Sequence, residues 1–397
     1  MKVGMILDHE FPFDERVEKE AFSLIGAGFD VFLLSPNSGY QSASENYKGL
    51  HIKRFKLNKK IRRKLNPTYL VLPFYRWIWS RYIERFIIEN QIDILHIHDL
   101  PLADIGVKMK LKYKIKLVCD QHEYWSKWIV LTSHYNDFLG KIVKFFSNWE
   151  KYERENLKVA DLLITVEEPL RQLYLTEIAI DSKKIIKVPN TPLREIFNEN
   201  NIDTKVKEIY GNNFVLFYAG VVDVLRGLRT VVHALPTIAE EIPNVKFLIA
   251  GREAKGSNLL KEAQEINVDK YIEFLGWLPL ERLPSFIAAS DVCINIPPVI
   301  SDYRNKIVPT KVYQYMAMRK PVIVGQSEFL KDFVSKYNIG FVINELDSKD
   351  LAKKIIQLNR YKHISKGISA NYEKIAEKFY WEVTVGELIQ SYKQLHN

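Results

Sequence analysis

The segment Phe217-Tyr218-Ala219-Gly220-Val221-Val222-Asp223-Val224-Leu225-Arg226-Gly227-Leu228 decides the fold class. The apolar run 214–219 predicts a buried strand that ends at Gly220, and a helical pattern begins near Gly227. A helix that starts directly after such a loop offers free backbone N–H groups and the positive end of its dipole. Arg226 adds a fixed positive charge there. The segment therefore predicts an anion-binding loop, and a tight turn with a solvent-facing Arg226 is the alternative.

Apolar runs of this kind alternate with amphipathic helical stretches along almost the whole chain. They lie at 3–7, 31–34, 92–97, 115–119, 162–166, 214–219, 245–250, 272–275, 292–296, 321–324 and 340–343. Continuous apolar strands separated by helices indicate parallel sheets that are covered on both faces. Because these strands are too many for one sheet of normal size, we expect an α/β protein with two doubly wound, Rossmann-like domains. The prolines and the polar stretch at 188–203 place the boundary near residue 190.

Composition limits the classes of protein that the chain can belong to. The 397 residues include 57 Lys and Arg against 48 Asp and Glu, and this excess of 57 − 48 = +9 suggests an anionic partner. Two cysteines, Cys119 and Cys293, exclude a disulfide scaffold and a zinc site built from cysteine. No apolar run approaches the length of a membrane-spanning helix, and 3–7 is too short for a signal peptide. We therefore expect a cytoplasmic protein.

A second group of positive charges follows the predicted strand 292–296. Arg304, Lys306 and Lys311 surround the start of the next predicted helix, and Pro309 suits the first turn of that helix. Two basic helix starts at neighbouring strand ends would form a clamp for a diphosphate. The alternative is a solvated basic loop.

The motifs around these two helix starts resemble those of the family 4 (group 1) glycosyltransferases, which have the GT-B fold. Gly220…Arg226-Gly227 matches the family's phosphate loop, and the segment 309–316, Pro-Thr-Lys-Val-Tyr-Gln-Tyr-Met, matches a second motif. The resemblance implies two Rossmann-like domains that face a central cleft. It assigns residues 1–190 to acceptor binding and 191–377 to nucleotide-sugar binding, with a C-terminal helix, about 378–397, that packs back on the first domain.

The resemblance also implies roles for individual residues. His98 would orient the donor sugar, and Arg226 and Lys311 would stabilise the departing phosphate. The predicted donor-binding residues are Gly220, Arg226, Gly227, Arg252, Gly276, Trp277, Lys306, Pro309, Thr310, Lys311 and Gln314. The predicted acceptor-side residues are Arg16, His122 and Glu123.

The sequence departs from the family pattern at three positions. Two glutamates that the family usually carries eight residues apart fall on Lys306 and Gln314, and Val221 stands where many members have an arginine. A glutamine can accept a hydrogen bond from a hydroxyl group, whereas a lysine cannot. The sequence therefore does not identify the donor sugar.

His96 and His98 share one face of a predicted strand, which raises the alternative of a metal site with Asp99, His122 and Glu123. A second alternative is that one of the two histidines, His96 in preference to His98, is a core residue. Because no Asp-x-Asp motif occurs, the charge on the leaving diphosphate would be neutralised by the basic residues and helix dipoles instead. We expect neither a metal nor any other cofactor.

Residues 51–82 combine a basic stretch with aromatic residues. Eight Lys and Arg residues and no acid occur between His51 and Lys64, and Tyr69, Trp77 and Tyr82 are among the aromatic residues that follow. Such a pattern suits an anionic membrane surface and a lipid-linked acceptor. An aromatic helix that packs in the core after a solvated loop is one alternative. Nucleic acid is another, but no recognised nucleic-acid module occurs, and we expect no nucleic acid partner.

These features predict an enzyme of the hexosyltransferase type. It would move a sugar from a nucleotide-sugar to a hydroxyl acceptor with retention of anomeric configuration, in the synthesis of a surface polysaccharide or glycolipid. It would be cytoplasmic, with possible peripheral attachment to the inner face of the membrane. Two alternatives remain open, a nucleotide-sugar 2-epimerase and a catalytically silent partner subunit that binds a nucleotide-sugar.

Overall fold

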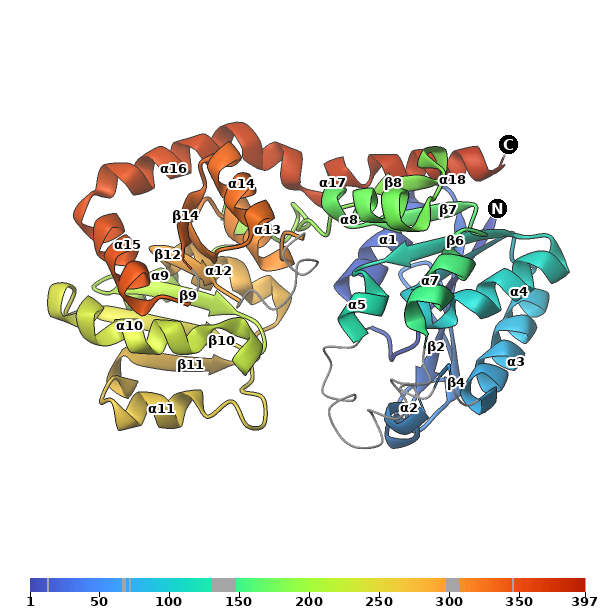
Figure 1. The fold of residues 1–397 in the computed structure, drawn as a ribbon, viewed down its shortest axis with the longest axis horizontal. Coiled ribbons are helices and arrows are strands. Elements are labelled where there is room, and N and C mark those ends of the chain that lie inside the picture. The colour runs from blue at the N-terminus through green and yellow to red at the C-terminus, as the bar shows by residue number, and fades with distance from the viewer. Residues whose placement is uncertain are drawn as a thin grey trace. The chain divides into compact units, whose positions relative to one another are not determined.

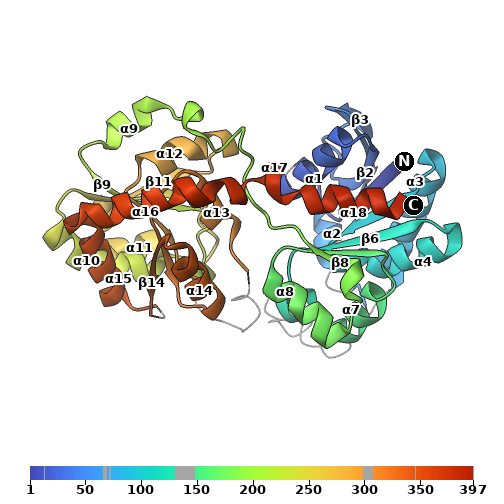
Figure 2. The same ribbon diagram turned by 90° about the horizontal axis from the view of Figure 1, so that it is seen from above.

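The computed structural model describes residues 1–12, 14–65, 69–70, 73–129, 148–297, 307–344 and 346–396. The chain divides into two compact units (Figure 1). The first unit contains Met1–Pro189 together with Val385–Asn397, and the second contains Asn190–Thr384. Helices lie on both sides of the sheet in each unit, as the two views show (Figures 1 and 2).

The sheet of the first unit has the strand order β3-β4-β2-β1-β5-β6-β7-β8. Its strands are β1 (Lys2–Ile6), β2 (Asp30–Asn37), β3 (Ser44–Tyr47), β4 (Leu50–Lys56), β5 (Ile94–His98), β6 (Lys116–Gln121), β7 (Leu162–Thr165) and β8 (Ile185–Lys187). The β3–β4 pair is antiparallel, and the other pairs are parallel. The helices of this unit are α1 (Glu15–Gly26), α2 (Lys59–Leu65), α3 (Pro73–Asn90), α4 (Ala103–Tyr113), α5 (Trp125–Ile129), α7 (Trp149–Leu157), α8 (Glu168–Leu173) and α18 (Gly386–His396).

The sheet of the second unit is parallel throughout, with the order β11-β10-β9-β12-β13-β14. Its strands are β9 (Phe214–Ala219), β10 (Val245–Ala250), β11 (Ile272–Gly276), β12 (Val292–Asn295), β13 (Val322–Gly325) and β14 (Gly340–Ile343). Its helices are α9 (Thr204–Tyr210), α10 (Leu228–Glu241), α11 (Leu259–Glu265), α12 (Leu283–Ala289), α13 (Thr310–Ala317), α14 (Glu328–Tyr337), α15 (Ser348–Arg360), α16 (Lys362–Ile375) and α17 (Trp381–Thr384).

The predicted α/β class with parallel sheets is confirmed, since a strand is present at every apolar run that the sequence analysis named. The central strand β9 is buried along its whole length, as expected for a strand covered on both faces. Three strands were not predicted, namely β3, β4 and β8. Strand β4 lies in the basic stretch 51–64, where the charged side chains hide the strand pattern.

The returning helix α18 belongs to the first unit, although its residues follow the whole second unit in the sequence. Figure 2 shows α18 lying along the first unit. Leu388 and Tyr392, one helical turn apart, form part of its inner face and are completely buried. In the part of the chain that the structure describes, no helix combines the length and the apolar character needed to cross a bilayer.

The carboxyl ends of β9 and β10 approach each other so closely that only glycine fits between them. The N–H of Gly220 donates to the carbonyl of Ala250 at 2.8 Å. A Cβ atom on Gly251 would lie only 1.8 Å from the carbonyl oxygen of Gly220. This close approach fixes the position at which the chain leaves β9.

We predict that Gly251→Ala lowers the free energy of unfolding of the second unit by at least about 1–3 kcal/mol, because the added methyl group must push two strand ends apart. Urea unfolding followed by circular dichroism measures the change. Gly367→Ala in α16 is the matched control, since a Cβ there meets no atom within 4 Å. The control should be unchanged or more stable by up to about 1 kcal/mol, because alanine favours helix more than glycine does. Wild-type stability of Gly251→Ala would contradict this account of the strand ends.

Candidate functional site

The loop between β9 and α10 is shaped by two glycines at its ends. Gly220 has φ 137°, and Gly227 has φ 71° in the left-handed region. A Cβ on Gly227 would lie 1.9 Å from the carbonyl oxygen of Ile296, which follows β12. The loop therefore packs against the neighbouring strand end, and α10 begins directly after it at Leu228. The predicted helix start near Gly227 is confirmed.

Lys311, in the first turn of α13, lies beside this loop. Its ammonium nitrogen is 4.1 Å from the centroid of the Tyr218 ring, and a Cβ on Gly220 would lie 2.7 Å from that nitrogen. Burial, reinforced by the positive charge of Arg226, lowers the pKa of Lys311 to about 7. Among the described residues, no carboxylate forms an ion pair with Lys311. An anion bound at the loop would restore a full positive charge to this lysine.

The other predicted donor-binding residues lie at the carboxyl ends of adjoining strands or in the two helix starts. Arg226 is exposed, and its Nε is 3.7 Å from Oδ2 of Asp223. Arg252 is the second residue after β10 and is exposed. Gly276 ends β11, and Trp277 after it is 64% exposed. Pro309 is the N-cap residue of α13, Thr310 is its first residue, and Gln314 is buried one turn later. Lys306 lies outside the described residues.

In the first unit, Arg16 is enclosed by three partners. Its Nε and Nη2 donate to the two carboxylate oxygens of Asp120, both at 2.9 Å, and its Nη1 donates to the carbonyl of Val188 at 2.9 Å. The same Nη2 lies 2.9 Å from Oε1 of Glu20, one turn along α1. Although burial alone would raise the pKa of Asp120, Arg16 and His122 hold it well below its usual range. Arg16 is therefore fully occupied inside the unit, and its predicted role toward an acceptor stays a prediction.

His122 extends this network toward the surface. Its Nε2 is 2.7 Å from Oδ2 of Asp120, and its Nδ1 is 3.4 Å from Oδ1 of Asp99. These carboxylates outweigh the effect of burial and raise the pKa of His122 to about 10. The side chain is 22% exposed, so an external group can reach it. The neighbouring Glu123 is partly exposed, and its carbonyl oxygen accepts a hydrogen bond from the hydroxyl of Tyr174 at 3.3 Å.

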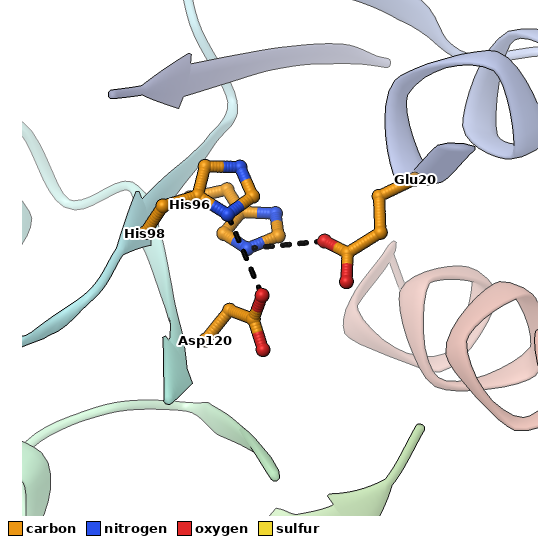
Figure 3. Close-up of side chains that lie close together, drawn as sticks. All are labelled: Glu20, His96, His98 and Asp120. Atoms are coloured by element: carbon orange, nitrogen blue, oxygen red, sulfur yellow. Dashed lines mark ion pairs between the residues drawn. The ribbon is translucent and has the colours of Figure 1, made fainter. Parts of the chain in front are cut away.

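His96 and His98 lie side by side on β5, and both are buried. Their ring centroids are 4.2 Å apart, with 28° between the ring planes. Figure 3 shows each ring turning a nitrogen toward a carboxylate, that of Glu20 for His96 and that of Asp120 for His98. The side chain of His98 is 0% exposed. Its predicted contact with a donor sugar therefore requires the covering side chains to move, and it stays a prediction.

The four side chains in Figure 3 could each offer one ligand atom to a metal ion. One such atom from each of Glu20, His96, His98 and Asp120 lies within 4.8 Å of the others. However, the Arg16 guanidinium already lies 2.9 Å from an oxygen of both carboxylates. A divalent cation would have to share these carboxylates with a buried positive charge at close range, which is unfavourable in a medium of low dielectric. The charges therefore fit an ion-pair network better than a metal centre.

Sequence reasoning assigned no role to three members of this network. Glu20 carried a local signal, since it lies four residues after Arg16 on an amphipathic helix. Asp120 carried a weaker one, because it stands near the end of a predicted strand. Tyr392, whose hydroxyl oxygen is 2.7 Å from Nδ1 of His96, carried none, since 296 residues separate the two.

Comparisons with known proteins agree on one family. The model described as "Glycosyl transferases group 1" matches residues 199–374, and the model described as "Glycosyltransferase Family 4" matches residues 17–191. The phosphatidyl-myo-inositol mannosyltransferase of Mycobacterium leprae (strain TN) is 20% identical over an alignment of 403 residues. The alignment covers 99% of this chain and 96% of that protein.

Solved structures show the same fold. The sucrose-phosphate synthase from Thermosynechococcus elongatus has a TM-score of 0.78 and 18% identity, and the match covers 100% of this chain and 99% of that chain. The Anabaena protein HepE in complex with UDP has a TM-score of 0.69 and 14% identity, with 99% and 100% covered. With the two parallel sheets, these matches confirm the predicted GT-B fold. The chain therefore belongs to the family 4 (group 1) glycosyltransferases with the GT-B fold.

Proposed function

We propose that this glycosyltransferase takes a hexosyl group from a nucleotide-sugar and transfers it, with retention of configuration and without a metal ion, to a hydroxyl acceptor. The observation that carries the proposal is Lys311, a cation without a carboxylate partner among the described residues, held against the backbone of Gly220. Buried charges in proteins are normally paired. The diphosphate of the donor would supply the missing partner.

Three sources of positive charge support a metal-independent reaction. The loop 220–227 leads into α10, whose first N–H groups and dipole favour an anion, and Arg226 and Lys311 flank the loop. Together they would neutralise the charge that develops on the leaving diphosphate. UDP is the first nucleotide to test, because HepE was solved with UDP.

The acceptor would bind to the first unit, near the surface group formed by His122, Asp99 and Glu123. In this proposal the leaving phosphate itself removes the proton of the acceptor hydroxyl on the same face of the sugar, so no protein nucleophile is needed. His98 orients the sugar. Synthesis of a surface polysaccharide or glycolipid, in the cytoplasm or at the inner face of the membrane, is the setting that we propose.

A catalytically silent partner subunit and a 2-epimerase are the competing functions. Gln314 stands in place of an expected glutamate and is buried, which favours the silent subunit if its amide cannot replace the carboxylate. An epimerase would convert a nucleotide-sugar without any acceptor. Product analysis with and without acceptor separates the three functions.

A membrane surface is the partner that the exposed face of α3 supports. Phe74, Trp77 and Ile88 are each more than half exposed, and their spacing places them along one side of the helix. The guanidinium of Arg81 lies 5.0 Å from the centroid of the Trp77 ring. Trp77 and Ile88 also line a groove of about 800 Å³. Its other lining residues include Lys56, Arg81, Tyr82, Arg85 and the two acidic residues Glu84 and Glu89.

Only some residues of the segment 51–82 are exposed and available for contact with lipid. Strand β4 takes up residues 50–56, and within it Arg54 is buried and pairs with Glu45 at 2.8 Å. Buried aromatic residues such as Tyr75 and Trp79 belong to the core, as the alternative interpretation expected. The proposed lipid surface is therefore the outer side of α3 together with the lysines Lys59 and Lys60 of α2.

We predict that Arg226→Ala lowers turnover by about 100-fold or more, by analogy with the loss of a transition-state donor. The same variant should lose the thermal stabilisation that the correct nucleotide among UDP, GDP, ADP, TDP and CMP gives to the wild type, about 2.7 kcal/mol at 100 times its Kd. Arg229→Ala is the control, since Arg229 is an exposed arginine three residues away that pairs with Glu262. Near-normal turnover of Arg226→Ala would refute its role.

We predict that the affinity for a nucleotide-sugar falls as the pH rises above about 7. The pKa of Lys311 is about 7, so above this pH the side chain loses its proton and its positive charge. Each pH unit above this pKa should weaken binding by up to about tenfold, until the raised pKa of the complex is reached. Titration calorimetry measures the Kd between about pH 6 and about pH 8.5. The diphosphate diester does not titrate in this range, so a change in Kd comes from the protein. Lys311→Met should bind weakly and with little pH dependence. An equally steep dependence in Lys311→Met would assign the titration to another group.

We predict that the chain co-sediments with vesicles that contain anionic lipid. Replacement of both Phe74 and Trp77 by serine should weaken this binding by at least about tenfold, because the loss of two aromatic side chains removes several kcal/mol of apolar contact. Tyr40→Ser is the control, since Tyr40 is 95% exposed and lies outside α3. Equal sedimentation of all three proteins, or none with the wild type, would exclude α3 as a lipid surface.

A further inference from the structure

We infer that Tyr392 of the returning helix α18 is a positioning residue for His98 and acts through the ring of His96. The inference rests on the proposed function for the role of His98 and adds a residue that sets the orientation of its ring. Tyr392 itself touches no reacting atom. The argument follows the contacts from α18 to β5.

The first contact joins Tyr392 to His96. The hydroxyl oxygen of Tyr392 lies 2.7 Å from Nδ1 of His96, and both side chains are completely buried. Among the described residues, this nitrogen is the one hydrogen-bond partner recorded for the Tyr392 hydroxyl. Since a buried hydroxyl proton needs an acceptor, Tyr392 donates and Nδ1 accepts. Burial, reinforced by the neighbouring His98, holds the pKa of His96 well below its usual range, so the ring is neutral. Its single proton is then on Nε2, which lies 3.7 Å from Oε2 of Glu20 and forms no hydrogen bond with it.

The second contact joins His96 to His98 by ring stacking. The two rings are 4.2 Å apart at an interplanar angle of 28°. Neither ring nitrogen of His98 has a hydrogen-bond partner among the described residues. Its Nδ1 lies 3.4 Å from Oδ2 of Asp120, an oxygen that already accepts a hydrogen bond from Arg16. Besides Asp120, the ring of His98 is therefore oriented by the ring stacked against it, and that ring is held by Tyr392.

The position of Tyr392 is itself well defined. Its ring packs edge-on against Phe29 with centroids 5.8 Å apart, and Leu388 anchors the preceding turn of α18 in the core. The chain enters this helix from the second unit, at the boundary between Thr384 and Val385. The orientation of a residue at the end of β5 therefore depends on a helix that follows the donor-binding unit in the sequence.

The experiment compares Tyr392→Phe with Tyr372→Phe in the full chain. Both changes delete one buried hydroxyl group, and Tyr372 lies in the second unit, where its hydroxyl is within 2.9 Å of the carbonyl oxygens of Lys320 and Ile339. A small rotation of a substrate-orienting ring lowers the rate of the chemical step more than it weakens binding. We expect Tyr392→Phe to lower kcat about tenfold or more and to leave the KM for the donor within about twofold. Tyr372→Phe should retain the wild-type kcat.

A double-mutant cycle shows whether Tyr392 acts through His98. When His98→Ala has already removed the ring, adding Tyr392→Phe should cost no further activity. Additive losses in kcat would overturn the inference, as would an unchanged kcat in Tyr392→Phe alone. Full activity of His98→Ala would instead remove the role of His98 in the proposed function.

A spectroscopic readout needs no turnover. In protein labelled with ¹⁵N at histidine, the imidazole signals of His96, assigned with the variant His96→Asn, report which ring nitrogen carries the proton. We expect the Nε2-protonated form in the wild type and in Tyr372→Phe, and a changed tautomer of His96 with a shifted His98 signal in Tyr392→Phe. Unchanged signals in Tyr392→Phe would overturn the inference even if no donor were ever found.

Discussion

Three oxygen-bearing groups from separate parts of the first unit converge on one buried guanidinium, that of Arg16. Asp120 at the end of β6 takes two of its hydrogen bonds, the carbonyl of Val188 takes a third, and Glu20 lies within ion-pair distance. An arginine is suited to this position because its planar fork stays charged and can bond several acceptors at once. By fixing Asp120, it also fixes the carboxylate on which His122 and His98 depend. The polar groups at the carboxyl end of this sheet thus share one electrostatic centre.

The buried cation of the second unit, Lys311, has a different environment from Arg16. Arg16 is neutralised by the protein, whereas Lys311 is close to the positive charge of Arg226 and has no carboxylate ion pair among the described residues. The buried Lys311 therefore carries a cost in the free protein that an anionic ligand can offset. This contrast separates the two ends of the proposed reaction. In the proposed reaction, the first unit would use its charges for orientation, and the second would present Lys311 to the donor.

Local patterns in the sequence predicted the fold well because the strands of a doubly wound sheet are buried on both faces. Strand β9 is a continuous apolar run, β10 is apolar except for Lys246, and Gly220 and Gly227 mark the loop by their spacing. The pattern failed at β4, where Arg54 is buried only because Glu45 and backbone carbonyl groups receive its guanidinium. The sequence alone does not show that Glu45 of the preceding strand and the distant carbonyl of Phe11 meet at this arginine.

The candidate site shows the same division between local and distant causes. The positive helix starts around Arg226 and Lys311 could be predicted, since loop, charge and helix are neighbours in the sequence. The burial of His98 and the contact of His96 with Tyr392 could not, because they depend on α1, β6 and α18 meeting at one place. The exposed and buried sides of α3 likewise became distinct only in the structure, since its aromatic residues surround the helix.

The return of α18 to the first unit has a consequence for how the protein is made. During synthesis residues 1–189 leave the ribosome first, but residues 385–397 become available only after the complete second unit has been translated. Until then the surface that Leu388 and Tyr392 cover is open to water, and Nδ1 of His96 lacks its donor. The unit that begins to fold first is therefore the last to be completed, and a nascent chain that stops within the second unit leaves an incomplete core for chaperones and proteases to recognise.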